Sequence, residues 1–368
     1  MKKLGTLALA VLPLGAAFAQ VGPNVQGPVT GGVTLFGVVD AALAWGSGSD
    51  ADRLRLVSGA NTSSRLGFRA FDDLGGGTFA GIWLEAGVNT DDGTGSASNS
   101  NNQPTGAGAE VPGRQGLMFN RRSTASLMGS WGELRVGRDY VSTFRNRDQV
   151  DPFGTVGVGT NQADVSTLMG VTATRASNMI GYFLPSSLGG FFGEAQLYMG
   201  ENLSGTATDS DGNGYQARLG YVAGPWGIAA AYGLTKYATT ASTGDASVWN
   251  IAGHYSFDFG TLSAGYYEDK IDRTTELTGK GFLIGGRFPI GKWELKTSYS
   301  QFETDAAGDP RTSKFAIGGV YSFSKRTQAY LTYAHADNNG AAAVALNGST
   351  TGLGRNSDGF DIGLKHSF

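Results

Sequence analysis

The longest connection between two strand-like segments of this sequence is residues 139–174, and it carries fixed charges of both signs. Its ionisable side chains include Arg145, Arg147, Asp148, Asp151 and Asp164. Connections longer than about 12–15 residues without a periodicity of their own are uncommon and usually functional. Fixed charges at close quarters order water and favour charged or polar solutes, and they need no covalent chemistry to do so. The segment is therefore predicted to be a loop that folds inward, into the opening of a pore.

A second set of charges lies on the strand-like segments. Arg65 and Arg69 alternate with apolar residues and so share the polar face of their strand, and Arg175 does the same if its apolar neighbours face lipid. With Asp148 and Asp151 on the inward loop, these arginines would create a transverse field across a constriction. Any single one of them equally fits a solvated surface group or an ion pair at the rim. The set is therefore a prediction for the pore as a whole.

Motifs for covalent or metal chemistry are weak. The three histidines are scattered over residues 254, 335 and 366, no G-x-S-x-G elbow exists, and there is no cysteine. Residues 209–214 copy the first half of a calcium loop, but Gly220 stands at the twelfth position, where a bidentate glutamate is needed. We therefore expect no enzyme activity, no cofactor and no metal site.

The elements that position these charges are segments of about ten residues with period-2 alternation. Residues 292–300 place Trp293, Leu295 and Tyr299 on one face and charged or small polar residues on the other. The same alternation fits a half-solvated sheet in a soluble sandwich. Short connections such as 129–132 and 289–291 alternate with long ones such as 90–115, which is typical of outer-membrane barrels. Counting the segments predicts sixteen strands.

The first residues indicate export. Residues 1–19 combine a positive start, a short apolar run and an A-x-A site, which together make a secretory signal peptide. The chain has 28 basic and 31 acidic residues, a net charge of −3, and loss of Lys2 and Lys3 with this leader lowers it to about −5. That balance offers no footprint for nucleic acid.

Composition favours a β protein, with 59 glycines, 10 prolines and 11% aromatic residues. No stretch after the leader approaches the roughly 18 apolar residues of a membrane helix. A membrane form of residues 20–368 must therefore be a closed barrel, since only helices and barrels satisfy their backbone in lipid. The tryptophans predicted to form its interfacial girdles are Trp83, Trp131, Trp226, Trp249 and Trp293.

Short motifs in a fixed order carry a family resemblance. They are VTLFGVVD at 33–40, SRLGFR at 64–69, DDLGGG at 72–77, LEAG at 84–87, FNR at 119–121, GR at 137–138, DPFG at 151–154, RASN at 175–178, YSFSKRT at 321–327 and GLKHSF at 363–368. Each is weak alone. Together they span nearly the whole mature chain, which resembles the trimeric general porins of Gram-negative outer membranes, most closely the betaproteobacterial type.

The resemblance implies an all-β, sixteen-stranded antiparallel transmembrane barrel whose third external loop folds inward. It adds Arg121 to the residues of the constriction. It also implies a homotrimer surrounded by outer-membrane lipids and lipopolysaccharide. The terminal Phe368 is similar to the signal read by the outer-membrane assembly machinery, although an aromatic residue in that position equally fits plain membrane anchoring.

These observations predict an outer-membrane porin that passes small hydrophilic solutes and ions passively. One alternative is a substrate-selective, anion-preferring channel on the same fold. An outer-membrane barrel enzyme would need a Ser/His or Asp/His set at the rim, and a secreted soluble sandwich would bind no lipid. Because the net charge is spread over loops, turns and pore, the sequence leaves the sign of the selectivity open.

Overall fold

The computed structural model describes residues 31–106, 108–110 and 115–368, so the predicted signal peptide lies outside the described residues. Strands dominate this part of the chain. They are β1 (Gly32–Gly48), β2 (Arg53–Ser58), β3 (Arg65–Gly75), β4 (Thr78–Gly87), β5 (Arg122–Gly129), β6 (Gly132–Tyr140), β7 (Arg175–Phe183), β8 (Phe191–Tyr198), β9 (Gly214–Ala223), β10 (Trp226–Thr235), β11 (Asp245–Phe257), β12 (Gly260–Asp272), β13 (Leu277–Ile290), β14 (Trp293–Thr304), β15 (Arg311–Ser322), β16 (Thr327–Asn339) and β17 (Ser357–Ser367). In the described ranges, no helix has the length and apolar character to cross a membrane.

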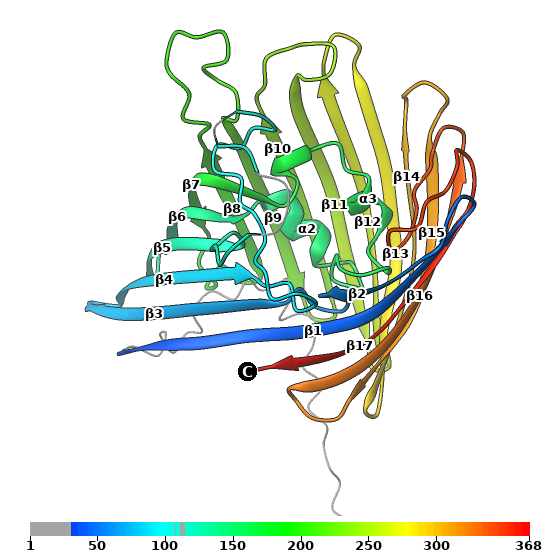
Figure 1. Cartoon of the computed structure of the whole chain (residues 1–368). Coiled ribbons are helices and arrows are strands. Elements are labelled where there is room, and N and C mark those ends of the chain that lie inside the picture. Colours follow the sequence, from blue (N-terminus) through cyan, green and yellow to red (C-terminus); the bar gives the residue numbers. More distant parts are fainter. Residues whose placement is uncertain (1–30, 107, 111–114) are drawn as a thin grey trace, which may run out of the picture.

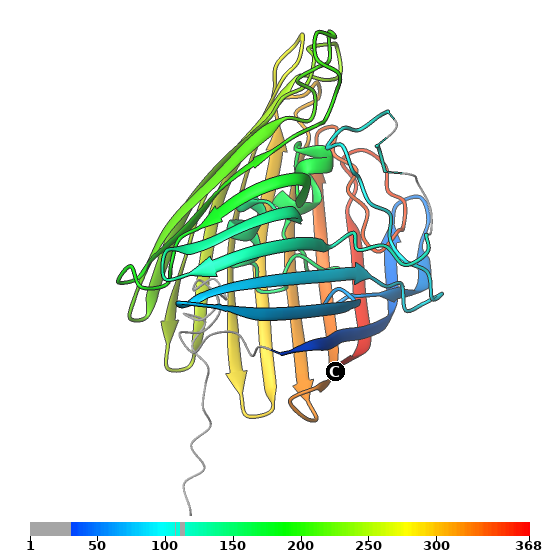
Figure 2. The same cartoon turned by 90° about the vertical axis from the view of Figure 1, so that its left-hand side faces the viewer.

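The strands form one closed antiparallel sheet (Figures 1 and 2). β1 closes it, because β1 pairs with β17 on one side and with both β2 and β3 on the other. β2 pairs with the second half of β1 and β3 with the first half, so these two short strands occupy one position in the barrel. The predicted count of sixteen strand positions is confirmed.

The alternation predicted for residues 292–300 is the alternation of the barrel wall. Trp293, Leu295 and Tyr299 are exposed on the outside, whereas Lys296 and Ser300 are buried on the inside. Every backbone amide within a closed sheet has a partner on a neighbouring strand, so the wall can expose apolar side chains to lipid without exposing a strand edge.

The long connection between β6 and β7 lies inside the barrel and contains α2 (Ser142–Asp148), α3 (Gln162–Val165) and the 3-10 turn η1 (Gly170–Thr172) (Figure 1). The Asn146 side chain of α2 donates to Asn250 Oδ1 at 2.8 Å. Further along, the Val158 amide donates to Asp361 Oδ2 at 2.8 Å. The segment, called the inner loop below, therefore follows the inner wall from β8 to β17.

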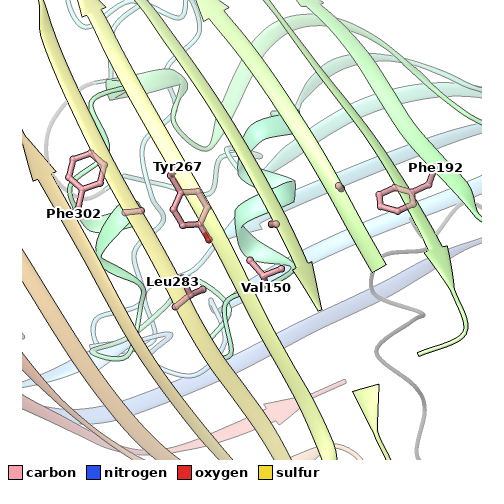
Figure 3. Close-up of a cluster of buried hydrophobic side chains, with 8 residues drawn as sticks. Val150, Phe192, Tyr267, Leu283 and Phe302 are labelled. Carbon is pink, nitrogen blue, oxygen red and sulfur yellow. The ribbon is translucent and has the colours of Figure 1, made fainter. Parts of the chain in front are cut away.

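Apolar contacts add to this attachment. Val150, which follows α2, packs in one buried cluster with Tyr267 of β12 and Leu283 of β13 (Figure 3). All three are at most 1% exposed. Burying a side chain such as Val150 contributes about 1.5–3 kcal/mol, which favours the loop on the wall over the loop in water.

A shorter segment, residues 59–64 between β2 and β3, also turns inward. Asp40 holds it: its buried carboxylate accepts from the amides of Asn61 and Thr62 at 3.2 and 2.8 Å, and Tyr330 donates its hydroxyl to the same carboxylate. Nothing in the alternation pattern predicted this interruption, because the strand resumes with the same facing at Arg65.

One detail of the predicted elements is corrected. Trp83 does not belong to an interfacial girdle, because it lies on the inner face, where its ring contacts Arg122 and Arg69. Trp131, Trp226, Trp249 and Trp293 are 40–55% exposed on the outside, as girdle residues require.

Candidate functional site

A cavity of about 890 Å³ lies between the inner loop and the opposite wall of the barrel. Among the described residues, seven basic and two acidic side chains line it. The basic ones are Arg65, Arg121, Arg175, Arg287, Lys292, Lys296 and Lys365, and the acidic ones are Asp148 and Glu294. Positive charge therefore predominates where a solute would pass.

Three predicted arginines come together on one side of this cavity. They are Arg65, Arg121 and Arg175, called the arginine wall below. Arg121 donates its Nε to Glu85 Oε1 at 2.6 Å, and Arg65 Nε lies 3.9 Å from the same oxygen. One carboxylate thus contacts two of the three guanidinium groups, which leaves the arginine wall with a net positive charge.

Arg175 is held by different contacts. Its Nε donates to the backbone oxygen of Arg121 at 2.8 Å, and its guanidinium carbon lies 4.3 Å from the centre of the Tyr140 ring. Arg121 in turn donates Nη2 to the Tyr140 hydroxyl at 2.8 Å. Tyr140 is not among the predicted pore residues, because it is the last residue of β6 and falls at the start of the long connection predicted for residues 139–174.

A second basic group comes from β13, β14 and β17. Lys296 donates to Asn61 Oδ1 at 3.1 Å, and Arg287 Nη2 pairs with Glu294 Oε1 at 2.9 Å. Lys365 lines the same cavity. The alternation of residues 292–300 predicts that Lys296 lies on the polar face of its strand, so the sequence carries a signal for this residue. It does not say which polar-face residues border an open space.

The two predicted loop aspartates are placed differently. Asp148 lines the cavity and accepts from Thr155 Oγ1 at 3.0 Å, and burial raises the pKa of its carboxyl. Asp151 is only 4% exposed and is not a lining residue. Its carboxylate accepts from the amides of Phe153 and Asn161 at 2.8 and 3.0 Å, so it shapes the inner loop instead of facing the arginine wall.

Arg69 also departs from its predicted place. It faces inward, but it is not among the residues that line the cavity. Its guanidinium lies 5.4 Å from the ring centre of Trp83 and 5.7 Å from that of Phe36. Arg122 stacks on Trp83 at 4.4 Å. Two inward aromatic rings thus hold these cations against the wall.

A buried charge network fixes α2 to the wall. Its members are Glu133, Arg135, Asp139, Arg145, Glu194 and Arg218. Arg145 of α2 reaches Asp139 at 2.8 Å, and Glu194 lies 3.1 Å from Arg218. The three arginines and three carboxylates named here balance, and a further arginine, Arg122, borders the buried charge network 3.9 Å from Asp139.

The returning half of the inner loop is tied down by charge as well. Arg147 pairs with Asp164 at 2.9 Å, and Asp269 of β12 accepts from Thr167 Oγ1 and the Leu168 amide at 2.6 and 2.8 Å. Burial raises the pKa of Asp164 to about 6, while the Arg147 charge opposes the rise.

The described residues contain no group of three or more histidine, aspartate or glutamate side chains placed to hold a metal ion. His335 and Asp358 form a pair at 2.8 Å, and Tyr333 donates to the same carboxylate. All three are partly exposed and lie apart from the residues that line the cavity. The chemistry available at the cavity is therefore that of fixed charges.

Comparison with known proteins agrees with this geometry. The family model described as Gram-negative porin matches residues 6–341. Outer membrane porin protein 32 of Delftia acidovorans is 32% identical over 387 residues, covering all of both chains. Among solved structures, the anion-selective porin from Comamonas acidovorans superposes with a TM-score of 0.79 and 28% identity over 92% of this chain and 99% of that one.

A more distant structure shares the fold alone. OmpT of Vibrio cholerae, solved in a trimer form, gives a TM-score of 0.61 at 13% identity over 92% of this chain and 100% of that one. The closed barrel, the family match and the identity to a porin over the full length all agree. This chain belongs to the family of Gram-negative porins, the channel-forming barrels of the outer membrane.

Proposed function

We propose that this porin passes small hydrophilic solutes passively and prefers anions over cations. The observation that carries the preference is the lining of the cavity, where seven basic side chains face two acidic ones. Charged groups close to a narrow aqueous passage set which ions enter it. The inner loop narrows the passage, and no covalent step takes place there.

The transverse field expected from the sequence changes form in this proposal. Asp148 is the one loop aspartate in the lining, and burial disfavours its charged form. The second basic group, with Arg287, Lys296 and Lys365, adds positive charge. The net effect favours anions, the selectivity that is also described for the porin from Comamonas acidovorans.

Swelling of proteoliposomes that contain the purified protein tests this function. Three solutes of matched size are compared: a neutral polyol, a small carboxylate salt and a small amine salt. For the two salts, an ionophore makes the counter-ions equally permeant, so that the swelling rate reports the entry of the organic ion. We expect the carboxylate to enter fastest and the amine slowest. Absence of swelling with every small solute, from correctly folded and inserted protein, would contradict the diffusion pore itself.

Assembly and export complete the proposal. We infer that residues 1–19 are a cleaved signal peptide and that three barrels associate in the outer membrane, among its lipids and lipopolysaccharide. The trimer form of the structurally similar OmpT supports this arrangement. Phe368 pairs through its backbone with Gly37 at 3.1 Å and is 45% exposed, which suits a terminal aromatic read by the assembly machinery. Cross-linking of the purified protein and deletion of Phe368 test these two points.

A further inference from the structure

Tyr140 is the one aromatic side chain of the cavity lining that touches two members of the arginine wall. Its hydroxyl accepts from Arg121 Nη2 at 2.8 Å. Its ring lies 4.3 Å from the guanidinium carbon of Arg175. The same ring stacks on Phe144 of α2, with centres 4.9 Å apart and an angle of 21° between the planes.

An irregularity in the barrel brings Tyr140 to this place. Gly137 pairs with Met179 and Asp139 with Ala176, so two steps along β6 oppose three along β7. Asn178, in the added step, has a positive φ of 55°, which suits a bulge. The shifted register sets Tyr140 directly opposite Arg175 of β7. The neighbouring residues Asp139 and Tyr140 both serve the interior: Asp139 in the buried charge network and Tyr140 at the arginine wall.

We propose that Tyr140 is a positioning residue that links the inner loop to the arginine wall and thereby sets the strength of the anion preference. This inference rests on the proposed function. Arginine side chains have many rotamers, and a planar guanidinium is fixed best by directional hydrogen bonds and by stacking on an aromatic face. Tyr140 supplies a hydrogen bond to Arg121 and an aromatic face to Arg175.

Both arginines have other contacts as well. Arg175 donates to the backbone oxygen of Arg121, so its position depends on the residue that Tyr140 also holds. Arg121 keeps its contact with Glu85, which pulls it toward a negative charge. Without Tyr140, Arg121 would lose the hydrogen bond that orients its Nη2, and Arg175 would lose its aromatic support.

Two substitutions separate the hydroxyl from the ring. Tyr140→Phe removes only the bond to Arg121, and Tyr140→Leu also removes the surface under Arg175. In reversal-potential measurements at about 0.1 M salt, we expect the chloride-over-potassium permeability ratio to fall about twofold for Tyr140→Phe and about fourfold for Tyr140→Leu. At about 1 M salt, where screening acts within roughly 3 Å, both variants should approach wild type.

A purely structural role gives a different result. If Tyr140 only supported the fold of the inner loop, its loss would change conductance and exclusion size at every salt concentration. Tyr198→Phe is the matched control, because this buried hydroxyl bonds Thr235, and the Tyr198 ring shares a buried cluster with Phe144 of α2. Among the residues that the structure describes, no arginine is recorded against Tyr198. The control should leave the permeability ratio unchanged.

The outcomes separate this inference from the function on which it rests. Arg121→Gln and Arg175→Gln are measured in the same series. If these two lower the permeability ratio while both Tyr140 variants match wild type, Tyr140 does not position the arginine wall and the inference is wrong. If the arginine variants also match wild type, the arginine wall does not select ions, and the anion preference proposed above fails first.

Discussion

Two groups of arginines face the inside of this barrel, and they differ in how completely carboxylates neutralise them. In the buried charge network, three arginines meet three carboxylates, and Arg218 and Glu194 are 3–4% exposed. In the arginine wall, Glu85 contacts Arg121 and Arg65 but not Arg175, and all three arginines line an open cavity. Balanced charges hold the loop in place, and unbalanced charges are left to act on passing ions.

The comparison explains why counting inward arginines says little about selectivity. A buried, paired charge has its field cancelled at short range, and breaking the pair leaves a charge without a partner. A charge in excess at an aqueous opening keeps a field that reaches about one Debye length, roughly 10 Å at 0.1 M salt. Substitution in the buried charge network should therefore mainly lower stability, whereas substitution in the arginine wall should mainly lower ion selectivity.

The largest expected effect is the loss of stability when the buried charge network is broken. Glu194→Gln leaves Arg218 buried without its carboxylate, which we expect to cost about 3 kcal/mol of unfolding free energy. Denaturant unfolding followed by tryptophan fluorescence measures it. Glu276→Gln is the control, because its pair with Lys270 is about half exposed and is screened by water, so its loss should change the unfolding free energy far less. Equal effects of the two variants would remove the distinction between buried and exposed pairs.

The opposite response is expected of the arginine wall. Changing Arg65, Arg121 and Arg175 to Gln together should lower the anion-over-cation permeability ratio about tenfold, equivalent to about 1.4 kcal/mol. Reversal potentials under a salt gradient measure the ratio. Arg326→Gln, in an exposed turn, is the control with the same chemical change. If the triple variant kept wild-type selectivity but lost stability, the arginine wall would stabilise the fold and would not select ions.

A smaller effect is expected from acidification. The pKa of Asp164 is about 6 in the folded chain, above the usual value near 3.9, so the folded state binds this proton more tightly than the unfolded state. Its contribution to stability therefore increases as pH falls through about 6.

Between about pH 7 and pH 5, wild type should gain roughly 1 kcal/mol relative to Asp164→Asn. Denaturant midpoints of both proteins at the two pH values give this difference. Asp258→Asn, in an exposed turn between β11 and β12, is the control. A gain of the same size in Asp164→Asn would assign the pH dependence to another group.

The smallest effect is expected at Arg69. Its guanidinium lies over aromatic rings and does not line the cavity, so Arg69→Gln should change the permeability ratio less than about twofold and stability by about 0.5–1 kcal/mol. The reversal potential and the denaturant midpoint are both measured. A selectivity change as large as that of the triple variant would place Arg69 in the arginine wall.

The sequence predicted the barrel well because alternation is a local signal. Trp293 and Lys296 could be assigned to opposite faces from their spacing alone. The partners of each strand follow from the order of the chain in an up-and-down barrel. The interruption at residues 59–64 was missed because its cause, the carboxylate of Asp40, lies about twenty residues away and reads as an ordinary strand residue.

The site was predicted less well because facing inward is not the same as lining an open space. Trp83 and Arg69 share an inward face, yet they pack on one another. Asp151 carries the expected charge, but its carboxylate accepts hydrogen bonds from amides of its own loop and does not face the cavity. Tyr140 depends on a one-residue bulge on the neighbouring strand, which no spacing along β6 reveals.

The measurement that tests the central claim most directly is the reversal potential of the wild-type protein in planar bilayers, under a fixed potassium chloride gradient at low and high mean concentration. The unbalanced arginine wall predicts an anion preference near 0.1 M that shrinks strongly near 1 M, as the screening length falls from roughly 10 to 3 Å. A cation preference in dilute salt, or an anion preference unaffected by salt, would contradict it.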